Sequence, residues 1–432
     1  MVKTVCSYTY LLLACILQCA CSEVTAQAVF EYRGIYSPTN ADDGFRSQYG
    51  TNHVDFDWDL WGHGMKKIAA NAPESVYATV SGEVHREQFC FSSEKLYELT
   101  TAYILDQFGE GNAAYSARIC IMPQDNKVAC TCSKCIRAGN TPGNATPAVT
   151  AMLTRLAKRF PRHRFYTSAY HTTLQLPARK LPANVGVLVS AARFQHRVNL
   201  SQAKGYEEMR HLLADWKKIT PNVYVWDYAR NFNDYLSPFP CLHAMQSRFR
   251  FYREMGVKGI LINGSGYDYS SFDDVQSVVM AQLMADPDLD VDKAIEAYFK
   301  EHYPVTSDLL TEYYTALESR TVETNHHLPI YSESMQELTD SYLKPEEFKV
   351  WRARLDKASK QTEGQERKQL NYLLTALSYT QLRLLEGKDS PEAAELRGEM
   401  VAVLQGSLEL KEMKFYSEDG GSIADYLKKF AR

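Results

Sequence analysis

Two aspartates that follow apolar runs are the residues of this chain best placed for acid–base chemistry. Asp125 comes shortly after the run 119–122, and Asp227 lies near the end of the run 223–228. Such runs are typical of buried strands. In a barrel of parallel strands, polar groups beyond the carboxyl ends point into the active-site mouth. Hydrolysis of a glycosidic bond needs two carboxyl groups across the bond, so we predict a catalytic pair with Asp125 as the acid. The alternative is that Asp125 and Asn126 cap a turn.

Polar and aromatic side chains near the predicted strand ends are candidates for substrate binding. Rigid amphipathic rings and hydrogen-bonding groups suit the recognition of sugar hydroxyls. An arginine here suits a substrate carboxylate or sulfate. The alternative for the tryptophans is packing in the core, and for the histidine a bond to a backbone carbonyl. The candidates are Arg33, Trp61, His63, Arg86, Gln88, Asn126, Tyr170, Trp226 and Tyr228.

Alternating strand and helix patterns must position these residues. A hairpin arm is expected at 76–82 and a capped helix at 94–108. About eight alternations predict an α/β fold with a (β/α)8 barrel over residues 29–285. An open doubly wound sheet is the alternative, but the Gly-rich dinucleotide fingerprint is absent. Helical patterns then dominate residues 286–432, which we expect to form a helical C-terminal region. The expected strands are 29–36, the segment around Trp58, 88–92, 119–122, 164–170, 185–190, 223–228 and 259–264.

Composition narrows the class of protein. The 432 residues are 45% hydrophobic and 12% aromatic, which is enough for a sizeable core. The net charge of -4 argues against a nucleic-acid-binding protein, which would usually carry a basic domain. An oligosaccharide or polysaccharide is the expected partner.

The first 28 residues are typical of an export signal. Lys3 precedes an apolar stretch, 5–17, that is too short to span a membrane, and residues 26–28 fit a cleavage site. Residues 12–15 also resemble a lipobox ending in Cys15, so a lipid anchor is left open. No other segment has the pattern of a membrane span. We expect an exported protein in the periplasm or attached at the outer membrane or cell surface.

Four cysteines in the body of the chain form a compact group with Cys130-x-Cys132-x-x-Cys135 and, from a neighbouring predicted strand, Cys90. An exported location favours disulfides between them. The alternative is a structural zinc site with four thiolate ligands. No other cofactor is expected.

Several of these motifs together resemble DUF4838, a large bacterial family of unknown function that is distantly similar to α-glucuronidases and other barrel glycoside hydrolases. The motif from Gln124 to Cys135 is the most specific part, and the resemblance runs from residue 29 to beyond 310. It implies a (β/α)8 barrel, a helical C-terminal region and action on complex glycans. Further matching positions are Arg33, Trp61 to His63, Gln88 to Cys90, Tyr170, Trp226 to Tyr228 and 238–240.

The leading hypothesis is therefore an exported glycoside hydrolase-like enzyme. A non-catalytic glycan-binding barrel is the main rival, because a fold does not imply an activity. A zinc-dependent hydrolase that uses the cysteine group is a third interpretation. It is disfavoured because several thiolates usually make a closed structural site.

Overall fold

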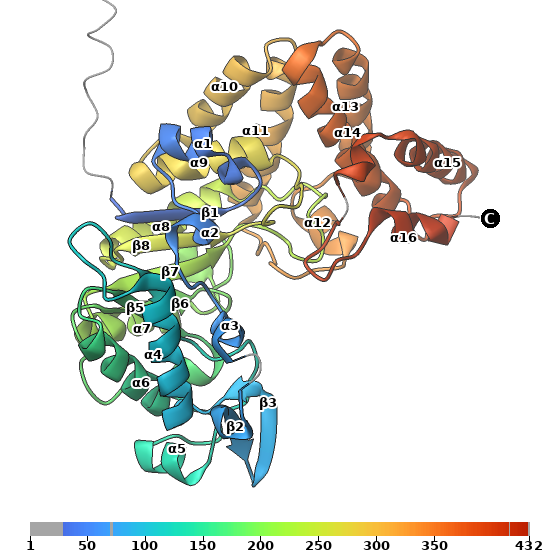
Figure 1. The fold of residues 1–432 in the computed structure, drawn as a ribbon. Helices are drawn as coiled ribbons and strands as arrows, with labels where there is room; N and C mark the ends of the chain where they lie inside the picture. Colours follow the sequence, from blue (N-terminus) through green and yellow to red (C-terminus); the bar gives the residue numbers. More distant parts are fainter. Residues whose placement is uncertain (1–28, 70–71, 414, 431–432) are drawn as a thin grey trace, which may run out of the picture.

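The computed structural model of the chain describes residues 29–69, 72–413 and 415–430. The predicted export signal, 1–28, lies outside the described residues. The fold is mixed α/β, with one main sheet, a separate hairpin and many helices (Figure 1). Within the described residues, no helix combines the length and the apolar character needed to cross a membrane.

The main sheet is parallel and curled, and it contains six strands in the order β1-β8-β7-β6-β5-β4. Strands β6, β7 and β8 coincide with the predicted runs to within one residue, because parallel strands are buried on both faces and read as continuous apolar segments. The strands are β1 (Tyr32–Tyr36), β4 (Arg118–Cys120), β5 (Arg164–Ala169), β6 (Val185–Ser190), β7 (Val223–Tyr228) and β8 (Gly259–Asn263).

The sheet does not contain the eight full strands that the alternation predicted. Two single-residue bridges lie in the chain between β1 and β4, one near Trp58, where the second strand was expected, and one at Asn52, in a segment expected to be a loop. Asn52 pairs in parallel with Gly34 of β1, and Leu60 pairs in parallel with Ile119 of β4. The bridges are short because α2 (Val54–Asp57) occupies most of the chain between them.

The predicted strand at 88–92 is wrong. Instead, β2 (Tyr77–Val80) and β3 (Glu83–Phe89) form an antiparallel hairpin outside the main sheet. The exposed polar side chains of residues 83–87 suit a two-stranded arm that faces water on one side. The hairpin lies with the short helix α5 (Ser133–Ala138) at the lower end of Figure 1.

Aromatic side chains fill the inner face of the curled sheet. The ring of Tyr224 lies 5.7 Å from the ring of Tyr32 and 5.1 Å from that of Tyr166, centroid to centroid. Trp58, which precedes the Leu60 bridge, contacts Tyr166 at 4.9 Å. Rings from distant strands meet here because the curl turns one face of the sheet inward.

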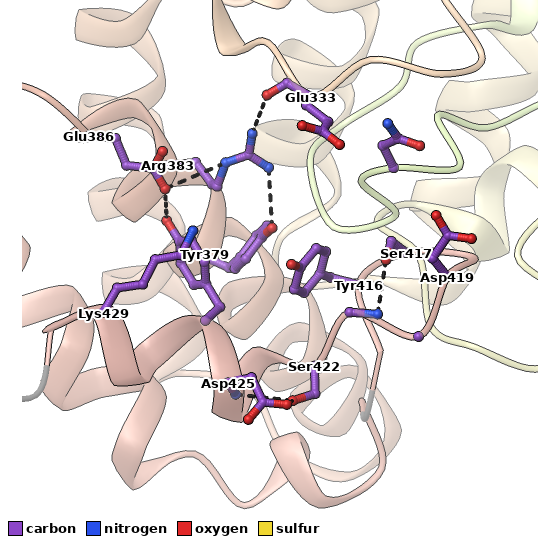
Figure 2. Close-up of a pocket in the computed structure, with 14 residues that line it drawn as sticks. Glu333, Tyr379, Arg383, Glu386, Tyr416, Ser417, Asp419, Ser422, Asp425 and Lys429 are labelled. Atoms are coloured by element: carbon purple, nitrogen blue, oxygen red, sulfur yellow. Dashed lines mark hydrogen bonds and ion pairs between the residues drawn. The ribbon is translucent and has the colours of Figure 1, made fainter.

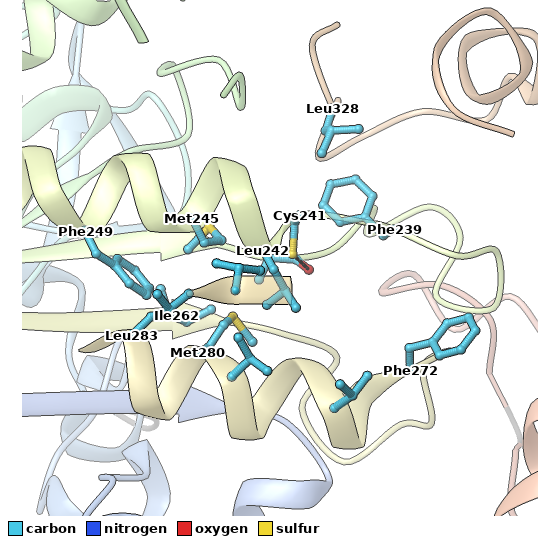
Figure 3. Close-up of a cluster of buried hydrophobic side chains, with 14 of the residues drawn as sticks. Phe239, Cys241, Leu242, Met245, Phe249, Ile262, Phe272, Met280, Leu283 and Leu328 are labelled. Carbon is cyan, nitrogen blue, oxygen red and sulfur yellow. Dashed lines mark hydrogen bonds between the residues drawn. The ribbon is translucent and has the colours of Figure 1, made fainter. Parts of the chain in front are cut away.

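Helices cover the outer face of the sheet. In Figure 3, Met245 and Phe249 of α8 face Met280 and Leu283 of α9, with Ile262 of β8 among them. The predicted helix at 94–108 is α4 (Glu94–Phe108), and Ser93 caps it by accepting a hydrogen bond from the Leu96 amide at 3.3 Å. The other helices of this part are α1 (Asp43–Tyr49), α3 (Met65–Ala69), α6 (Thr146–Arg159), α7 (Tyr206–Ile219), α8 (Leu242–Glu254) and α9 (Asp273–Ala285).

Helices after α9 form the C-terminal part of the molecule, beside the sheet in Figure 1. Their apolar side chains, including Leu317, Trp351 and Leu373, belong to the same buried cluster as the outer face of the sheet. The two parts therefore share a core. The helices are α10 (Val291–His302), α11 (Ser307–Thr324), α12 (Met335–Ser341), α13 (Pro345–Ser359), α14 (Gly364–Leu384), α15 (Pro391–Gly406) and α16 (Ile423–Leu427). Short 3₁₀ helices lie at Thr39–Ala41, Glu74–Val76, His171–Thr173, Leu200–Gln202, Glu409–Lys411 and Lys428–Phe430.

Candidate functional site

Asp125 lies on the loop that follows β4, at the carboxyl end of the sheet, and its side chain is 60% exposed. Its two neighbours are held from below by Gln88, which is 1% exposed. The Gln88 amide donates to the Gln124 carbonyl at 3.2 Å and to Asn126 Oδ1 at 2.9 Å, and Gln88 Oε1 accepts from the Gln124 amide at 3.0 Å. Asn126 in turn donates to the Glu87 carbonyl at 3.0 Å. Gln88 and Asn126, predicted as binding residues, thus act as supports that fix the direction of Asp125.

His63 supports the same loop from the other side. Its Nδ1 lies 2.6 Å from the Pro123 carbonyl oxygen, and its own carbonyl accepts a hydrogen bond from Gln124 Nε2 at 2.9 Å. His63 thus binds a backbone carbonyl, which was the alternative to a role in substrate binding.

Tyr170 and His171, directly after β5, face Asp125. The distance from His171 Nε2 to Asp125 Oδ1 is 3.5 Å, and the rings of Tyr170 and His171 stack with centroids 3.8 Å apart. Burial and the Asp125 carboxylate raise the pKa of Tyr170 to about 12, so its hydroxyl stays a donor at neutral pH. Burial, together with the charges of Lys127 and Arg193, lowers the pKa of His171 despite Asp125. The φ of His171 is 45°, a left-handed conformation that is uncommon outside glycine and concentrates at functional sites.

The structure does not bring Asp227 to Asp125, so the predicted carboxylate pair is not formed. Side chains alternate along β7: Tyr224 and Trp226 face the aromatic interior, whereas Val225 packs in the outer core. Asp227 falls on the outer side with Val225 and is fully buried beneath α8. A side chain on that face of the strand cannot reach a substrate at the mouth.

The carboxylate of Asp227 is occupied by four donors. Arg248 binds it through two nitrogens at 2.7 and 2.6 Å, the Tyr252 hydroxyl at 2.6 Å and the Tyr228 amide at 2.8 Å. Burial alone would raise the pKa of Asp227, but the charge and hydrogen bonds of Arg248 outweigh it, so the pKa is lowered. A permanently ionised, saturated carboxylate holds the fold together and has no free lone pair for proton transfer.

The predicted arginines also lie away from the mouth. Arg33 is on the outer side of β1, where its guanidinium donates to the Gly50 carbonyl at 2.5 Å. Arg86 lies on the hairpin and pairs with Glu74 at 2.6 Å. Neither is positioned to bind a substrate carboxylate at the end of the sheet.

The remaining predicted residues lie toward the carboxyl end of the sheet. Trp61 and Trp226 are half-buried, and their rings are in contact at 4.9 Å and pack against the aromatic interior. Tyr228 is held by Ser190 at 3.2 Å between oxygens. The ring of Tyr170 lines a pocket beside Asp125.

A pocket of about 420 Å³ opens beside Tyr170 and His171. Lys127 and Arg193 line it, and neither cation makes an ion pair with any residue that the structure describes. The predicted site included neither of them, nor His171. Both cations could have been found from their positions in the sequence, because Lys127 directly follows Asn126 and Arg193 comes three residues after β6.

Glu418 brings a second carboxylate to the mouth from the C-terminal part of the chain. The loop carrying it is held by a hydrogen bond from the Glu418 amide to the Phe232 carbonyl at 2.8 Å, and its side chain accepts from the Tyr331 hydroxyl at 2.9 Å. Tyr331 links this carboxylate to the end of β7, because its ring lies 5.4 Å from that of Phe232, which lies 5.8 Å from that of Tyr228. The charges of Asp125 and Glu418 both raise the pKa of Tyr170. No local sequence pattern marks Glu418, because its position depends on a contact between distant segments.

A larger pocket of about 520 Å³ lies in the C-terminal part, and its lining includes Ser417 and Asp419, the sequence neighbours of Glu418 (Figure 2). The one arginine in its lining is engaged: Arg383 pairs with Asp234 at 3.3 Å and with Glu386 at 3.8 Å, and it donates to the Glu333 carbonyl at 2.6 Å.

The four grouped cysteines converge, but not as disulfides. All six cysteines of the described residues are free. The Sγ atom of Cys90 lies 3.7 Å from that of Cys132 and 3.6 Å from that of Cys135, whereas a disulfide bond is about 2.05 Å long. With Cys130, the four sulfur atoms all lie within 4.8 Å of one another. The expectation that disulfides join these residues is therefore corrected.

A curled parallel sheet with an aromatic interior and a polar mouth at its carboxyl end defines the chain as a mixed α/β protein with a candidate ligand site at that mouth. The family model DUF4838, a domain of unknown function, matches residues 20–315, and the chain belongs to this family. No curated protein matches the chain.

Among solved structures, the chain is similar to one described as a GH138 enzyme targeting pectin rhamnogalacturonan II. The two share 9% sequence identity and superpose with a TM-score of 0.37. The match covers 83% of this chain and 59% of that chain, so this chain spans less than two thirds of that protein's length.

Proposed function

We propose that the protein is a glycoside hydrolase-like enzyme that acts on acidic glycans at the mouth of the curled sheet. The observation that carries the proposal is the position of Asp125, an exposed carboxylate on a braced loop, 3.5 Å from His171 and beside a pocket lined by two cations. Exposure gives the carboxylate access to a substrate, and the braced loop fixes its direction.

Asp125 and Glu418 are the proposed carboxyl pair, in place of Asp125 and Asp227. One protonates the leaving oxygen of the glycosidic bond, and the other acts as base or nucleophile on the opposite face of the sugar. Burial and the charge of Asp125 raise the pKa of Tyr170, so its hydroxyl stays protonated and is available as a donor beside Asp125. This arrangement supports Asp125 as the group that exchanges the proton.

Lys127 and Arg193 indicate the substrate class. Two cations in one pocket suit a carboxylate or sulfate group, since hydrogen bonds between ionised partners are short and strong. The rings of Tyr170 and His171, which line the same pocket, provide a flat face against which a sugar can pack. A uronic acid or sulfated sugar in the pocket would leave its glycosidic oxygen toward Asp125.

The fold proposed for this site is a (β/α)8 barrel reduced at its second and third strands. The bridges at Asn52 and Leu60 stand in the positions of those strands, and both are parallel to their neighbours. Trp61, next to the Leu60 bridge on β4, contacts Trp226 of β7, as side chains from opposite walls of a barrel would. We also propose that the mature protein is exported to the periplasm or the outer cell surface, on the strength of residues 1–28.

A glycan-binding protein without turnover is the second candidate. Glu418 is exposed and accepts a hydrogen bond from Tyr331, which is 56% exposed. An exposed carboxylate and ring of this kind can bind a glycan without breaking a bond, which favours this candidate. The two candidates differ in whether a bond is broken.

The experiment is to incubate the purified protein with neutral, uronic acid-containing and sulfated oligosaccharides, measuring product release and binding separately. The proposal predicts release from an acidic member of the set, lost in Glu418→Gln and kept in Glu395→Gln, an exposed glutamate on α15. Binding of acidic oligosaccharides with no release by the wild-type protein would favour the binding protein instead.

A further inference from the structure

Two separate segments meet at the group of four thiols. Cys90 follows the hairpin strand β3, and Cys130, Cys132 and Cys135 follow the Asp125 loop and open α5. Cys90 is separated from Cys132 and Cys135 by 42 and 45 positions in the sequence. A backbone hydrogen bond from the Thr131 amide to the Thr79 carbonyl at 2.8 Å brings the loop to the hairpin. It does not by itself require all four sulfur atoms to point to one spot, and no disulfide is formed among the described cysteines.

The spacing of the sulfur atoms fits one tetrahedral metal ion. Zinc–sulfur bonds of about 2.3 Å, directed to the corners of a tetrahedron, separate the sulfur atoms by about 3.8 Å. The observed distances from Cys90 are 3.7 and 3.6 Å, and all four atoms lie within 4.8 Å of one another. Thiols packed for apolar contact alone have no reason to adopt this mutual spacing.

The surroundings also suit bound thiolates. The Thr79 amide donates to Cys130 Sγ at 3.3 Å, and such outer hydrogen bonds orient and stabilise metal ligands. The Asn140 side chain fixes the same loop by donating to the Cys130 carbonyl at 3.1 Å. Cys90, Cys130 and Cys135 are 6%, 3% and 0% exposed, so the group is closed to solvent on most sides, as structural metal sites are.

We propose that Cys90, Cys130, Cys132 and Cys135 bind one zinc ion and that this ion ties the β2–β3 hairpin to the loop that carries Asp125. Each thiol releases one proton as it binds, and the four thiolates fill the coordination sphere. A filled sphere leaves no position for water or substrate, so the zinc is structural. The tie matters for the mouth because Gln88, two residues before Cys90, supports both neighbours of Asp125.

The primary test is made on the wild-type protein: elemental analysis for zinc and iron, together with alkylation of native and unfolded protein followed by mass measurement. The expected result is one zinc per chain, four thiols that resist alkylation until an organomercurial displaces the metal, and zinc released in step with thiol titration. Iron in place of zinc, or a mass four hydrogens lower with no metal, which means two disulfides, would overturn the proposal.

Variants give a second readout that does not depend on activity. Cys135→Ser should lose the zinc and lower the melting temperature, whereas Cys241→Ser, at a buried thiol outside the group, should keep a full zinc content. Cys241 is a matched control because a serine there can still donate to the Ala229 carbonyl, which Cys241 contacts at 3.8 Å. Chelation should lower the melting temperature of the wild type and of Cys241→Ser but leave that of Cys135→Ser unchanged. If the chelator changes the melting temperature of none of the three proteins, the proposed zinc link between the hairpin and the loop is contradicted.

Discussion

Asp125 and Asp227 show how surroundings decide the role of a carboxylate. Asp125 is exposed and has a tyrosine and a histidine beside it. Asp227 is fully buried, and Arg248 neutralises it through two hydrogen bonds. A buried ion pair of this kind is sensitive to the loss of either partner, because the remaining charge then has no counter-charge and no water.

Replacing Asp227 should therefore destabilise the protein without touching the mouth. We predict that Asp227→Asn lowers the free energy of unfolding by about 3–5 kcal/mol, the cost of leaving a buried charge unpaired. Urea denaturation followed by tryptophan fluorescence measures this. Asp215→Asn removes a surface aspartate paired with Lys218 and should leave the free energy of unfolding nearly unchanged, because ion pairs in contact with solvent contribute little. Equal effects of the two substitutions would contradict the assignment of Asp227 to the core.

The cations of the pocket are expected to control affinity for acidic ligands. Hydrogen bonds to charged groups contribute about 1.5–3 kcal/mol, so Lys127→Ala or Arg193→Ala should weaken the binding of an acidic oligosaccharide by about 10- to 100-fold. Neutral oligosaccharides should bind either variant as they bind the wild type. Calorimetric titration measures both, with Lys158→Ala, at an exposed lysine on α6, as the control. Equal losses for acidic and neutral ligands would remove the basis for an acidic substrate.

At the scale of elements, the mouth depends on a loop, a hairpin and a group of thiols that support one another. Gln88 belongs to β3 of the hairpin, yet its side chain makes hydrogen bonds with both residues that flank Asp125. The hairpin thus acts as a prop for a loop of the main sheet.

Removing the Gln88 side chain, which supports the Asp125 loop, should affect turnover more than stability. Gln88→Ala leaves the amide and carbonyl of Gln124 without their partner, which costs about 1–3 kcal/mol of stability. Because the direction of Asp125 then varies, we expect kcat to fall while KM changes little. Steady-state kinetics on an acidic oligosaccharide at a temperature well below the melting point separates the two constants. A rise in KM with an unchanged kcat would indicate that Gln88 contacts the substrate instead.

Much of the sheet could be predicted from the sequence, because β6, β7 and β8 are continuous apolar runs with few competing interpretations. The face of the strand to which a single side chain points could not be predicted. Successive side chains along a strand point to opposite faces, so an error of one residue reverses the direction of a side chain. For this reason Asp227, which points to the outer face, was predicted to lie at the mouth. The strand at 88–92 was misplaced because a short apolar segment does not reveal its partner.

The candidate site was predictable only where its residues are local in sequence. Trp226 and Tyr228 lie at the end of a strand, Tyr170 and Asp125 come after one, and all four could be placed from that pattern. The supporting role of Gln88 and the arrival of Glu418 depend on long-range contacts that no spacing records. The spacing of the cysteines did predict the group of four thiols. The expected export of the protein favoured disulfides between them, whereas the structure has free cysteines.

At the scale of the whole molecule, five histidines with shifted pKa values, of which His53 and His196 are buried, make stability depend on pH. Burial lowers the pKa of His196, His53, His171 and His327, whereas hydrogen bonding and charge from Glu318 raise the pKa of His243 against its burial. His196 is shifted furthest: it is fully buried, and neither of its ring nitrogens has a hydrogen-bond partner among the described residues.

The sign of the effect follows from proton uptake. Below a pH of about 6.5 the unfolded chain protonates these histidines, while the folded protein keeps His196 neutral, so the free energy of unfolding falls as the pH falls. We predict a lower melting temperature at pH 5 than at pH 7, with His243 opposing the trend. His196→Gln should reduce this difference, and His211→Gln, at an exposed histidine, should not. A melting temperature that rises on acidification would contradict the prediction.

The most direct test of the central claim is the rate of reducing-end release from acidic oligosaccharides by the wild type, Asp125→Asn and Asp106→Asn. Loss of a positioned acid–base group lowers a rate by about 10²- to 10⁴-fold, so Asp125→Asn should lose that much activity at an unchanged melting temperature. Asp106→Asn, at an exposed aspartate on α4, should match the wild type. Full activity in Asp125→Asn would contradict the account, because the reaction would then not depend on the carboxylate around which the site is built.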